Sequence, residues 1–376
     1  MAKDVAKGGL AGVIAAQTAL SWIDGERGML VYRGYAIDDL ASNASFEEVV
    51  HLLLEGSLPT KSQLDDVKDR LGKYAALPEH VVQVLRAQSK VAAPMEALRT
   101  GVSLLGAGLT TPDVIDFEDT KERAYAIVAQ VPAVIGAFQR GRRGDEPFAP
   151  DPSRSLAYNL LLGLIGHEPI EAFERAIDVA LVLHAEHTLN ASTFAARLAA
   201  STLSDIYSAI TSAIGTLRGP LHGGANEQVA NMLEEIPSVD AVEDYIDRRL
   251  QAKKRIMGFG HRVYRTEDPR AKHLREWAQQ IADAMGESEV VDKALRVQEV
   301  VLERKGLYVN VDFFSAPLYT SLGIPRDLFT PIFAASRVAG WTAHVLEQQA
   351  DNRLIRPSSE YIGDRRAEWI PIEERG

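Results

Sequence analysis

Two histidines lie in glycine-rich segments that suit ligand binding or catalysis. His222 belongs to the segment LHGGAN, and His261 belongs to the segment GFGHR. Glycine lets a backbone approach a ligand closely and adopt positive φ, and a helix start offers free N–H groups. Each histidine could equally close a tight turn, so neither is assigned a catalytic role on its own surroundings.

Asp312 is a carboxylate among apolar residues, in the segment VNVDFF. Apolar neighbours raise the pKa of a carboxyl group, which suits a general base working near neutral pH. The alternative is a structural one, in which Asp312 is the N-cap of the helix that follows.

Several arginines are placed where they could bind small carboxylates. A guanidinium binds a carboxylate through two parallel hydrogen bonds, each contributing roughly 1.5–3 kcal/mol. A charge within an apolar helix needs a reason, whereas exposed arginines more often form surface ion pairs. The candidates are Arg262, Arg265 and Arg270 after His261, Arg337 in an apolar helix, and Arg353 and Arg356 near the C-terminus.

A metal site is not expected. His184 and His187 share one face of a helix at a spacing of three, but HAEH matches neither common zinc pattern and no third ligand is evident nearby. Cysteine is absent, which excludes thiolate ligands and disulfides. The segment GFG lacks the third glycine of a dinucleotide fingerprint and does not follow a strand.

The apolar spacing predicts an all-α fold. Ser45 and Glu48 form a capping-box pattern before an apolar run, and Pro132 should kink or split its helix. The segments 18–22 and 29–32 flank a turn-rich connection and predict a small β-hairpin near the N-terminus. Helices are expected near 64–75, 79–90, 94–107, 121–141, 154–165, 169–185, 192–201, 205–217, 225–235, 239–254, 271–285, 288–304 and 327–349.

The composition narrows the class of protein. The chain has 376 residues, which is above the usual size of one domain. Hydrophobic residues make up 46% of it, enough for a large buried core. A net charge of −11 disfavours a general nucleic-acid binder. The sequence contains neither a transmembrane run nor a secretory signal, so we expect a cytoplasmic protein with no membrane partner.

Three segments taken together resemble the motifs of the citrate synthase family. They are LHGGANE, then GFGHRVYR ending in DPR, then NVD, and they occur in the family's order at similar separations. The resemblance extends over nearly the whole chain, including the HAEH segment and RPS near the C-terminus. Each motif is modest alone, and the ordered set is specific.

The resemblance implies a condensation of acetyl-CoA with oxaloacetate, followed by hydrolysis of citryl-CoA to citrate and CoA. Asp312 would remove a proton from the acetyl methyl group, and His222 would donate a hydrogen bond to the thioester oxygen. His261 would polarise the ketone of oxaloacetate and protonate the new alkoxide. No cofactor is implied, because acetyl-CoA is a co-substrate.

The resemblance also implies which residues bind the substrates. His187, Arg270 and Arg337 match positions that hold oxaloacetate. Arg356 matches the arginine that reaches the site of the partner subunit in a homodimer. The CoA-binding positions implied are Arg265 and the loop around the adenine, namely Lys254, Arg255, Ile256, Gly258, Phe259 and Gly260.

The family's architecture is a large helical domain that carries an inserted smaller helical domain, with the active-site cleft between them. We therefore expect residues 1–221 and 318–376 in the large domain and residues 222–317 in the small one. Glycine and proline cluster at 215–224 and 314–325, where the chain could cross between domains; two ordinary loops would leave the same signal.

Two rival functions remain open. A 2-methylcitrate synthase performs the same chemistry on propionyl-CoA, and room for one methylene group contributes only about 1–3 kcal/mol of discrimination. A non-catalytic helical protein that binds acyl-CoA would need neither Asp312 nor the two glycine-flanked histidines.

Overall fold

The computed structural model describes residue 10, residues 12–107 and residues 116–375, and it confirms the predicted all-α class. These described residues contain sixteen α-helices and one small sheet. The first helices are α1 (Ile37–Asn43), α2 (Phe46–Glu55), α3 (Lys61–Tyr74), α4 (Glu79–Gln88), α5 (Pro94–Leu105), α6 (Phe117–Arg143), α7 (Leu156–Ile165) and α8 (Glu171–His184). The later ones are α9 (Ala191–Ser201), α10 (Ile206–Leu217), α11 (Ala225–Glu235), α12 (Val242–Gln251), α13 (Pro269–Met285), α14 (Glu289–Lys305), α15 (Val311–Ser321) and α16 (Phe329–Ala350).

Short 3₁₀ helices complete the element order. They are η1 (Val239–Ala241), η2 (Arg326–Leu328) and η3 (Ile372–Glu374). The predicted helix at 239–254 is therefore one 3₁₀ turn followed by α12, which ends at Gln251. No helix in the described ranges is both long and apolar enough to cross a membrane.

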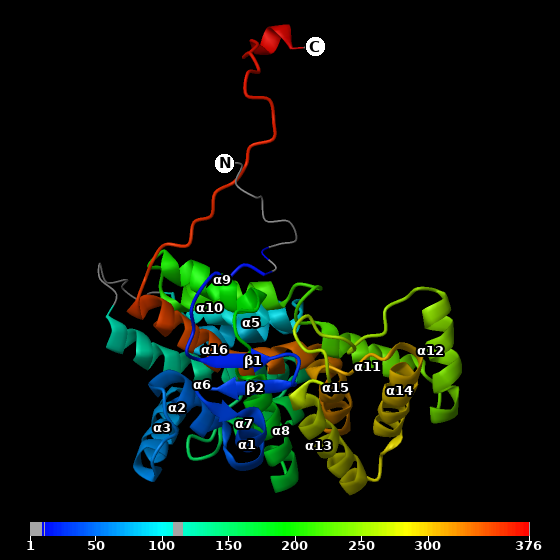
Figure 1. Ribbon diagram of the computed structural model, residues 1–376. Coiled ribbons are helices and arrows are strands. Elements are labelled where there is room, and N and C mark those ends of the chain that lie inside the picture. Colours follow the sequence, from blue (N-terminus) through cyan, green and yellow to red (C-terminus); the bar gives the residue numbers. More distant parts are fainter. Residues whose placement is uncertain (1–9, 11, 108–115, 376) are drawn as a thin grey trace.

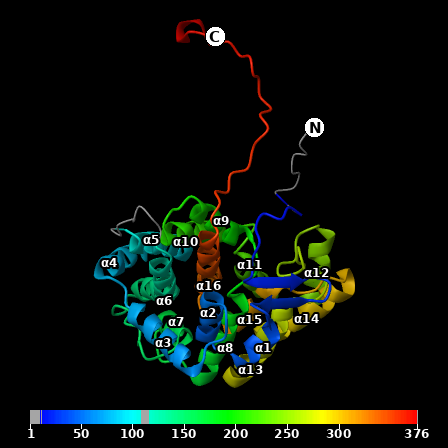
Figure 2. The same cartoon turned by 60° about the vertical axis from the view of Figure 1, so that its left-hand side comes forward.

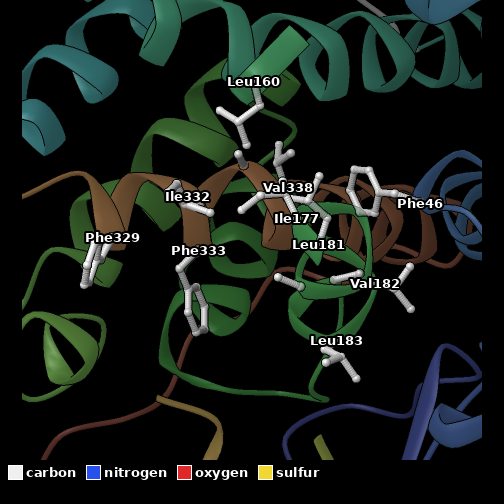
Figure 3. Close-up of a cluster of buried hydrophobic side chains, with 14 of the residues drawn as sticks. Phe46, Leu160, Ile177, Leu181, Val182, Leu183, Phe329, Ile332, Phe333 and Val338 are labelled. Carbon is white, nitrogen blue, oxygen red and sulfur yellow. The ribbon is translucent and has the colours of Figure 1, made fainter. Parts of the chain in front are cut away.

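Helix α16 is the central element of the larger group of helices (Figures 1 and 2). It packs against α2, α6, α8, α9 and α10 and is buried along most of its length. Figure 3 shows Ile332 and Val338 of α16 among apolar side chains of α7 and α8 such as Leu160 and Leu181. Full burial of such a side chain contributes about 1.5–3 kcal/mol, so this cluster provides much of the fold's stability.

Local capping starts the helices where the sequence pattern predicts. The capping box at Ser45 is confirmed: its side chain accepts a hydrogen bond from the N–H of Glu48, and the Glu48 carboxylate accepts one from the N–H of Ser45. Pro132 does not split its helix, because α6 continues to Arg143. Residues on every side of Pro132 are buried, and this packing offsets the lost hydrogen bond.

The N-terminal sheet contains the predicted hairpin and one further strand. Strands β1 (Ser21–Asp24), β2 (Met29–Tyr32) and β3 (Tyr35–Ala36) are antiparallel in the order β1-β2-β3. Ser21 pairs with Tyr32 and Asp24 pairs with Met29. The first strand begins at Ser21 rather than at Thr18, and its first residue is buried against the helical core.

Helices α11–α15 form a second group that packs chiefly within itself. Helix α15 contacts α11, α13 and α14, and α12 packs on α14. The group meets the rest of the molecule through α13 on α8 and α1, and through α11 on α16. In Figure 1 this group occupies the right-hand side, with α12 and α14 farthest from α6. The proline-containing segment 314–325 is not a long loop, because α15 continues to Ser321 with Pro317 inside it.

Candidate active site

The loop before His261 is attached to the segment before α15. Phe259 and Val309 form an isolated antiparallel bridge. The N–H of Gly260 donates to the carbonyl of Tyr308 at 2.9 Å, and the N–H of Asn310 donates to the carbonyl of Gly258 at 2.9 Å. This short ladder fixes the position of His261 relative to the start of α15, which carries Asp312.

Gly258 is required at this ladder for two reasons. Its φ of +79° is rarely adopted by residues with a side chain. A Cβ atom there would lie 2.7 Å from Cδ2 of Phe313 and 2.8 Å from Cγ2 of Val229. The glycine thus allows the loop to pack directly on α15 and α11, which explains one glycine of the GFG segment.

His261 is held as a neutral ring with a defined tautomer. Its Nδ1 accepts hydrogen bonds from the N–H groups of Val263 at 3.0 Å and Tyr264 at 3.2 Å. Backbone N–H groups only donate, so Nδ1 carries a lone pair and the proton of the neutral ring lies on Nε2. Burial and the charge of Arg270 lower the pKa of His261 to about 4. The side chain therefore offers a neutral N–H donor at Nε2.

Arg270 forms a buried ion pair with Asp268. Its Nε donates to Oδ1 of Asp268 at 2.9 Å, and its Nη2 donates to Oδ2 at 2.7 Å. The same carboxylate accepts hydrogen bonds from the N–H groups of Arg270 and Val311. Asp268 therefore caps α13, orients the guanidinium and ties it to the start of α15.

Asp312 lies in the first turn of α15 and is not its N-cap. Asn310 is the N-cap, because its side chain accepts the N–H of Asp312 at 3.1 Å. Burial raises the pKa of the Asp312 carboxyl to about 6, against the opposing charges of Arg270 and Arg337. The raised pKa expected from its apolar neighbours is confirmed. Among the described residues, the carboxylate receives no side-chain or backbone hydrogen bond, so its oxygens are free for a ligand.

His222 is also neutral, and Ser192 sets its tautomer. Its Nε2 accepts the N–H of Ser192 at 3.3 Å and lies 2.8 Å from the Ser192 hydroxyl. The proton of the ring therefore lies on Nδ1. Burial and the charge of Arg337 lower the pKa of His222 to about 4. Burial is thus the main cause of the neutral state.

His187 lies beside His261 and Tyr264. The ring centroids of His187 and His261 are 5.2 Å apart in an edge-on arrangement. Nε2 of His187 lies 3.3 Å from the Tyr264 hydroxyl. Burial, then Arg270 and Arg337, hold the pKa of His187 well below its usual value. The three rings form one polar aromatic wall at the end of α8.

Arg337 is a buried cation with donors to spare. Its side chain is 2% exposed, its Nε donates to the carbonyl of His184 at 2.6 Å, and its guanidinium lies over the ring of Phe333. Burial lowers the pKa of Arg337 to about 10, so it is charged at neutral pH. Its Nη groups make no hydrogen bond within the described part of the chain, which suits a carboxylate ligand.

The N-terminal hairpin supports the loop after His261. A Cβ atom on Gly25 would lie 2.1 Å from the carbonyl oxygen of Val263, so only glycine allows this approach. The N–H of Arg265 donates to the carbonyl of Gly25 at 2.9 Å. This contact leaves the side chain of Arg265 exposed.

The remaining predicted binding residues divide between the loop and the C-terminal segment. Lys254 and Arg255 are exposed, whereas Ile256, Phe259 and Gly260 are half-buried. Arg356 is exposed in the segment that leaves the body after α16 (Figures 1 and 2), so the single chain does not bring it to the other site residues.

Four contributing residues were not predicted. Ser192 positions His222, Tyr264 positions His187, and Asp268 positions Arg270. The sequence suggests His184 only as a metal ligand. Its Nδ1 lies 2.7 Å from the carbonyl of Ala180, and its buried Nε2 has no partner among the described residues. The spacing of three to His187 was a usable signal for His184; the contact of Ser192 with a residue 30 positions away left none.

This arrangement combines the parts needed to form a carbanion equivalent and to add it to a carbonyl compound. It has a carboxylate with a raised pKa, two neutral histidines with opposite tautomers and two buried arginines. Within the described residues, no group of three or more histidine or acidic side chains could hold a metal ion. A helical scaffold with this site defines an enzyme for acid–base chemistry on a small anionic substrate.

Comparison with known proteins identifies the family. The family model described as citrate synthase, C-terminal domain, matches residues 9–358. Citrate synthase 2 of Bacillus subtilis is 48% identical over 368 residues, covering 98% of each chain. The 2-methylcitrate synthase of Shewanella oneidensis is 41% identical over 378 residues, covering 100% of this chain and 99% of its own.

The solved structures agree. Citrate synthase from Pyrobaculum aerophilum superposes with a TM-score of 0.92 at 39% identity, covering 98% of this chain and 95% of its own. The chain belongs to the citrate synthase family, and it is an enzyme of the acyltransferase class.

Proposed function

We propose that this enzyme is a citrate synthase that condenses acetyl-CoA with oxaloacetate and hydrolyses citryl-CoA to citrate and CoA. The observation that carries the proposal is the position of Asp312 in the first turn of α15, where its carboxylate has no hydrogen-bond partner among the described residues and burial raises its pKa to about 6. Above that pH the group is a carboxylate, and it is a stronger base than an ordinary aspartate.

The first step is removal of a proton from the acetyl methyl group by Asp312. A thioester α-proton is far less acidic than a carboxylic acid, so the developing charge on the thioester oxygen must be stabilised. The Nδ1–H of His222 supplies the donor, since Ser192 occupies Nε2. One well-placed donor of this kind contributes about 2.7–4 kcal/mol.

The second step joins the enolate carbon to the ketone carbon of oxaloacetate. The Nε2–H of His261 polarises the ketone and then protonates the alkoxide that forms. Water next attacks the thioester carbon of citryl-CoA, which releases CoA as the thiol and citrate as the new carboxylate. A neutral ring donates this hydrogen bond without adding a positive charge beside Arg270, and the proton that it gives to the alkoxide is replaced by the one that Asp312 has taken from the methyl group.

Oxaloacetate is a dianion, and three residues are assigned to it. Arg270 and Arg337 bind its carboxylates, and His187 donates a hydrogen bond to it. Burial strengthens these interactions, since solvent screens them less. A few convergent arginines thus suffice for anion binding on a chain with a net charge of −11. CoA is assigned to the exposed loop of residues 254–260 and to Arg265.

The proposed organisation has two domains and two subunits. Residues 222–317 form the small domain, residues 1–221 and 318–376 form the large one, and closure of the cleft excludes water from the enolate. The self-packing of α11–α15 supports this division, although α15 continues past the second boundary to Ser321. Arg356 completes the site of a partner subunit, a role supported by its exposed position on the extended C-terminal segment.

A second candidate is 2-methylcitrate synthase, which the similarity to the enzyme of Shewanella oneidensis supports. The test is kcat/KM for acetyl-CoA and propionyl-CoA at saturating oxaloacetate, with the product identified by chromatography. We expect citrate and a preference for acetyl-CoA of at least about tenfold, within the range that one methylene group provides. A higher kcat/KM for propionyl-CoA would assign the chain to the second candidate.

A further inference from the structure

The loop between α8 and α9 contains a strained residue. Thr188 has a φ of +51°, which is unfavourable for a β-branched side chain. It follows His187 directly and lies two residues before Asn190, the N-cap of α9. Such strain persists only where surrounding contacts determine the conformation, so the contacts of Thr188 identify what holds this loop.

The N–H of Thr188 is held by a side chain from the N-terminal sheet. It donates to the hydroxyl of Ser21 at 3.0 Å. That hydroxyl in turn donates to Oε1 of Glu186 at 2.9 Å. Because a carboxylate only accepts hydrogen bonds, the direction of this pair is fixed and the Ser21 oxygen is free to accept from Thr188.

Glu186 is fully buried and is fixed from a second direction by His344. Nε2 of His344 lies 3.0 Å from Oε1 of Glu186. Nη1 of Arg197 donates to Nδ1 of His344 at 3.0 Å, and an arginine cannot accept a hydrogen bond. His344 is therefore a neutral ring with its proton on Nε2, and it donates that proton to the Glu186 carboxylate.

The backbone of Glu186 is held as tightly as its side chain. The hydroxyl of Tyr32 donates to the carbonyl of Glu186 at 2.9 Å. Opposite the carboxylate, a Cβ atom on Gly340 would lie 2.4 Å from Oε2 of Glu186. Helix α16 can therefore pack here only through a glycine.

The restrained loop carries contacts to two candidate catalytic groups. His187 adjoins Thr188 and lies edge-on to His261. The side chain of Asn190 accepts the hydroxyl of Ser192 at 2.8 Å, and Ser192 binds Nε2 of His222. One buried carboxylate thus connects the oxaloacetate side of the site with the thioester side.

We propose that Glu186 is a positioning residue for the condensation: through Ser21 it holds Thr188 in its left-handed conformation and so fixes His187 and Ser192 relative to each other. It does not touch substrate. The proposal rests on the proposed function, because it assigns His187 to oxaloacetate and His222 to the thioester.

The main test is Ser21→Ala, which removes the hydroxyl between Glu186 and Thr188 and leaves the buried charge in place. We expect kcat/KM for oxaloacetate to fall about tenfold or more, since small misplacement of a binding group costs up to about 10²-fold. The KM for acetyl-CoA should change less than about twofold, because the assigned CoA loop lies elsewhere. Ser21→Thr, which keeps the hydroxyl, should recover activity.

The matched control is Ser89→Ala. Ser89 is also buried, and its hydroxyl donates to the carbonyl of Arg86 at 2.8 Å in another part of the fold. This variant loses a comparable hydrogen bond, so it measures the purely structural effect. If Ser21→Ala matched Ser89→Ala in kcat and in both KM values, the proposal would be overturned.

The second test is Glu186→Gln, with Glu47→Gln as its control. Glu47 is another buried carboxylate, and its Oε1 accepts the N–H of Leu156 at the start of α7. We expect kcat/KM for oxaloacetate to fall in Glu186→Gln and to stay near the wild-type value in Glu47→Gln. Should Glu186→Gln fail to fold, the serine pair still decides the outcome.

Strain gives the most specific readout. Glycine adopts a φ of +51° without steric cost. The double variant Ser21→Ala, Thr188→Gly should therefore have a kcat/KM for oxaloacetate at least about threefold higher than that of Ser21→Ala. Absence of any recovery would contradict a restraint acting through Thr188. Release of CoA by the wild-type enzyme in the presence of oxaloacetate is measured first. Its absence would overturn the proposed function itself. Normal wild-type activity together with unaffected variants would overturn only the role of Glu186.

Discussion

Asp312→Asn should lower activity and raise stability at the same time. Asparagine keeps the shape of the side chain and removes the base, so kcat should fall at least about 10²-fold, the usual effect of losing a general base. Burial raises the pKa of the Asp312 carboxyl from 3.8 to about 6, and this unfavourable ionisation is absent from the variant.

The magnitude follows from the difference between the two pKa values. A pKa difference of about 2.2 corresponds to a change of at most about 3 kcal/mol in the free energy of unfolding. Solvent screening of the half-buried side chain reduces this value. A raised pKa favours the protonated folded state, so its contribution to stability is complete below pH 3.8 and is lost as the pH rises through 6. At pH 7–8 the wild type bears the full cost, and Asp312→Asn should unfold at a higher denaturant concentration.

The assays are thiol release for kcat and urea unfolding for stability, both at pH 7.5. Asp178→Asn is the matched control. Burial and the nearby Glu47 raise the pKa of Asp178 to about 7, but its carboxylate binds the N–H of Phe46 and the guanidinium of Arg175. Its kcat should stay within about twofold. A folded Asp312→Asn variant with wild-type turnover would refute the assignment of the base.

Three further results are expected. The acid limb of the pH profile of kcat/KM should have its midpoint near pH 6, set by Asp312, with activity at pH 5 about a tenth of the plateau; a midpoint near 4 would contradict this. Ser192→Ala should lower kcat about tenfold, because it removes the hydroxyl that donates to Asn190 and lies against Nε2 of His222, a contact that orients the ring; steady-state kinetics with an unchanged kcat would count against that role. Gly258→Ala should lower kcat and raise the KM for acetyl-CoA, since its Cβ would lie 2.7 Å from Phe313; wild-type values for both parameters would exclude a tight approach there.

The sequence predicted the helical elements well where apolar residues recur at helical spacing. Most of the expected helices lie within a few residues of those found, and Ser45 marks the start of α2. The sequence did not locate α15 correctly, because Pro317 resembles a loop signal. Its partners on α11, α13 and α14 bury that helix almost completely, and such tertiary packing cannot be read from local residue types.

The site was predicted as a set of residues and not as a geometry. Apolar neighbours correctly indicated a raised pKa for Asp312, and glycines indicated the loop of His261. The tautomers of His222 and His261 depend on backbone N–H groups of Ser192, Val263 and Tyr264.

The strain at Thr188 also requires the folded chain. Neither its positive φ nor its contact with Ser21 leaves a mark on local sequence, because residues 167 positions apart meet there. Long-range contacts of this kind determine the chemistry of the site once the helices are in place.

The most direct test of the central claim is release of CoA by the wild-type enzyme with acetyl-CoA, in the presence and absence of oxaloacetate. The proposed condensation must precede hydrolysis, so free thiol should appear with both substrates present and not with acetyl-CoA alone. Equal thiol release without oxaloacetate would identify a simple thioesterase and contradict the account. No release under either condition would contradict it as well.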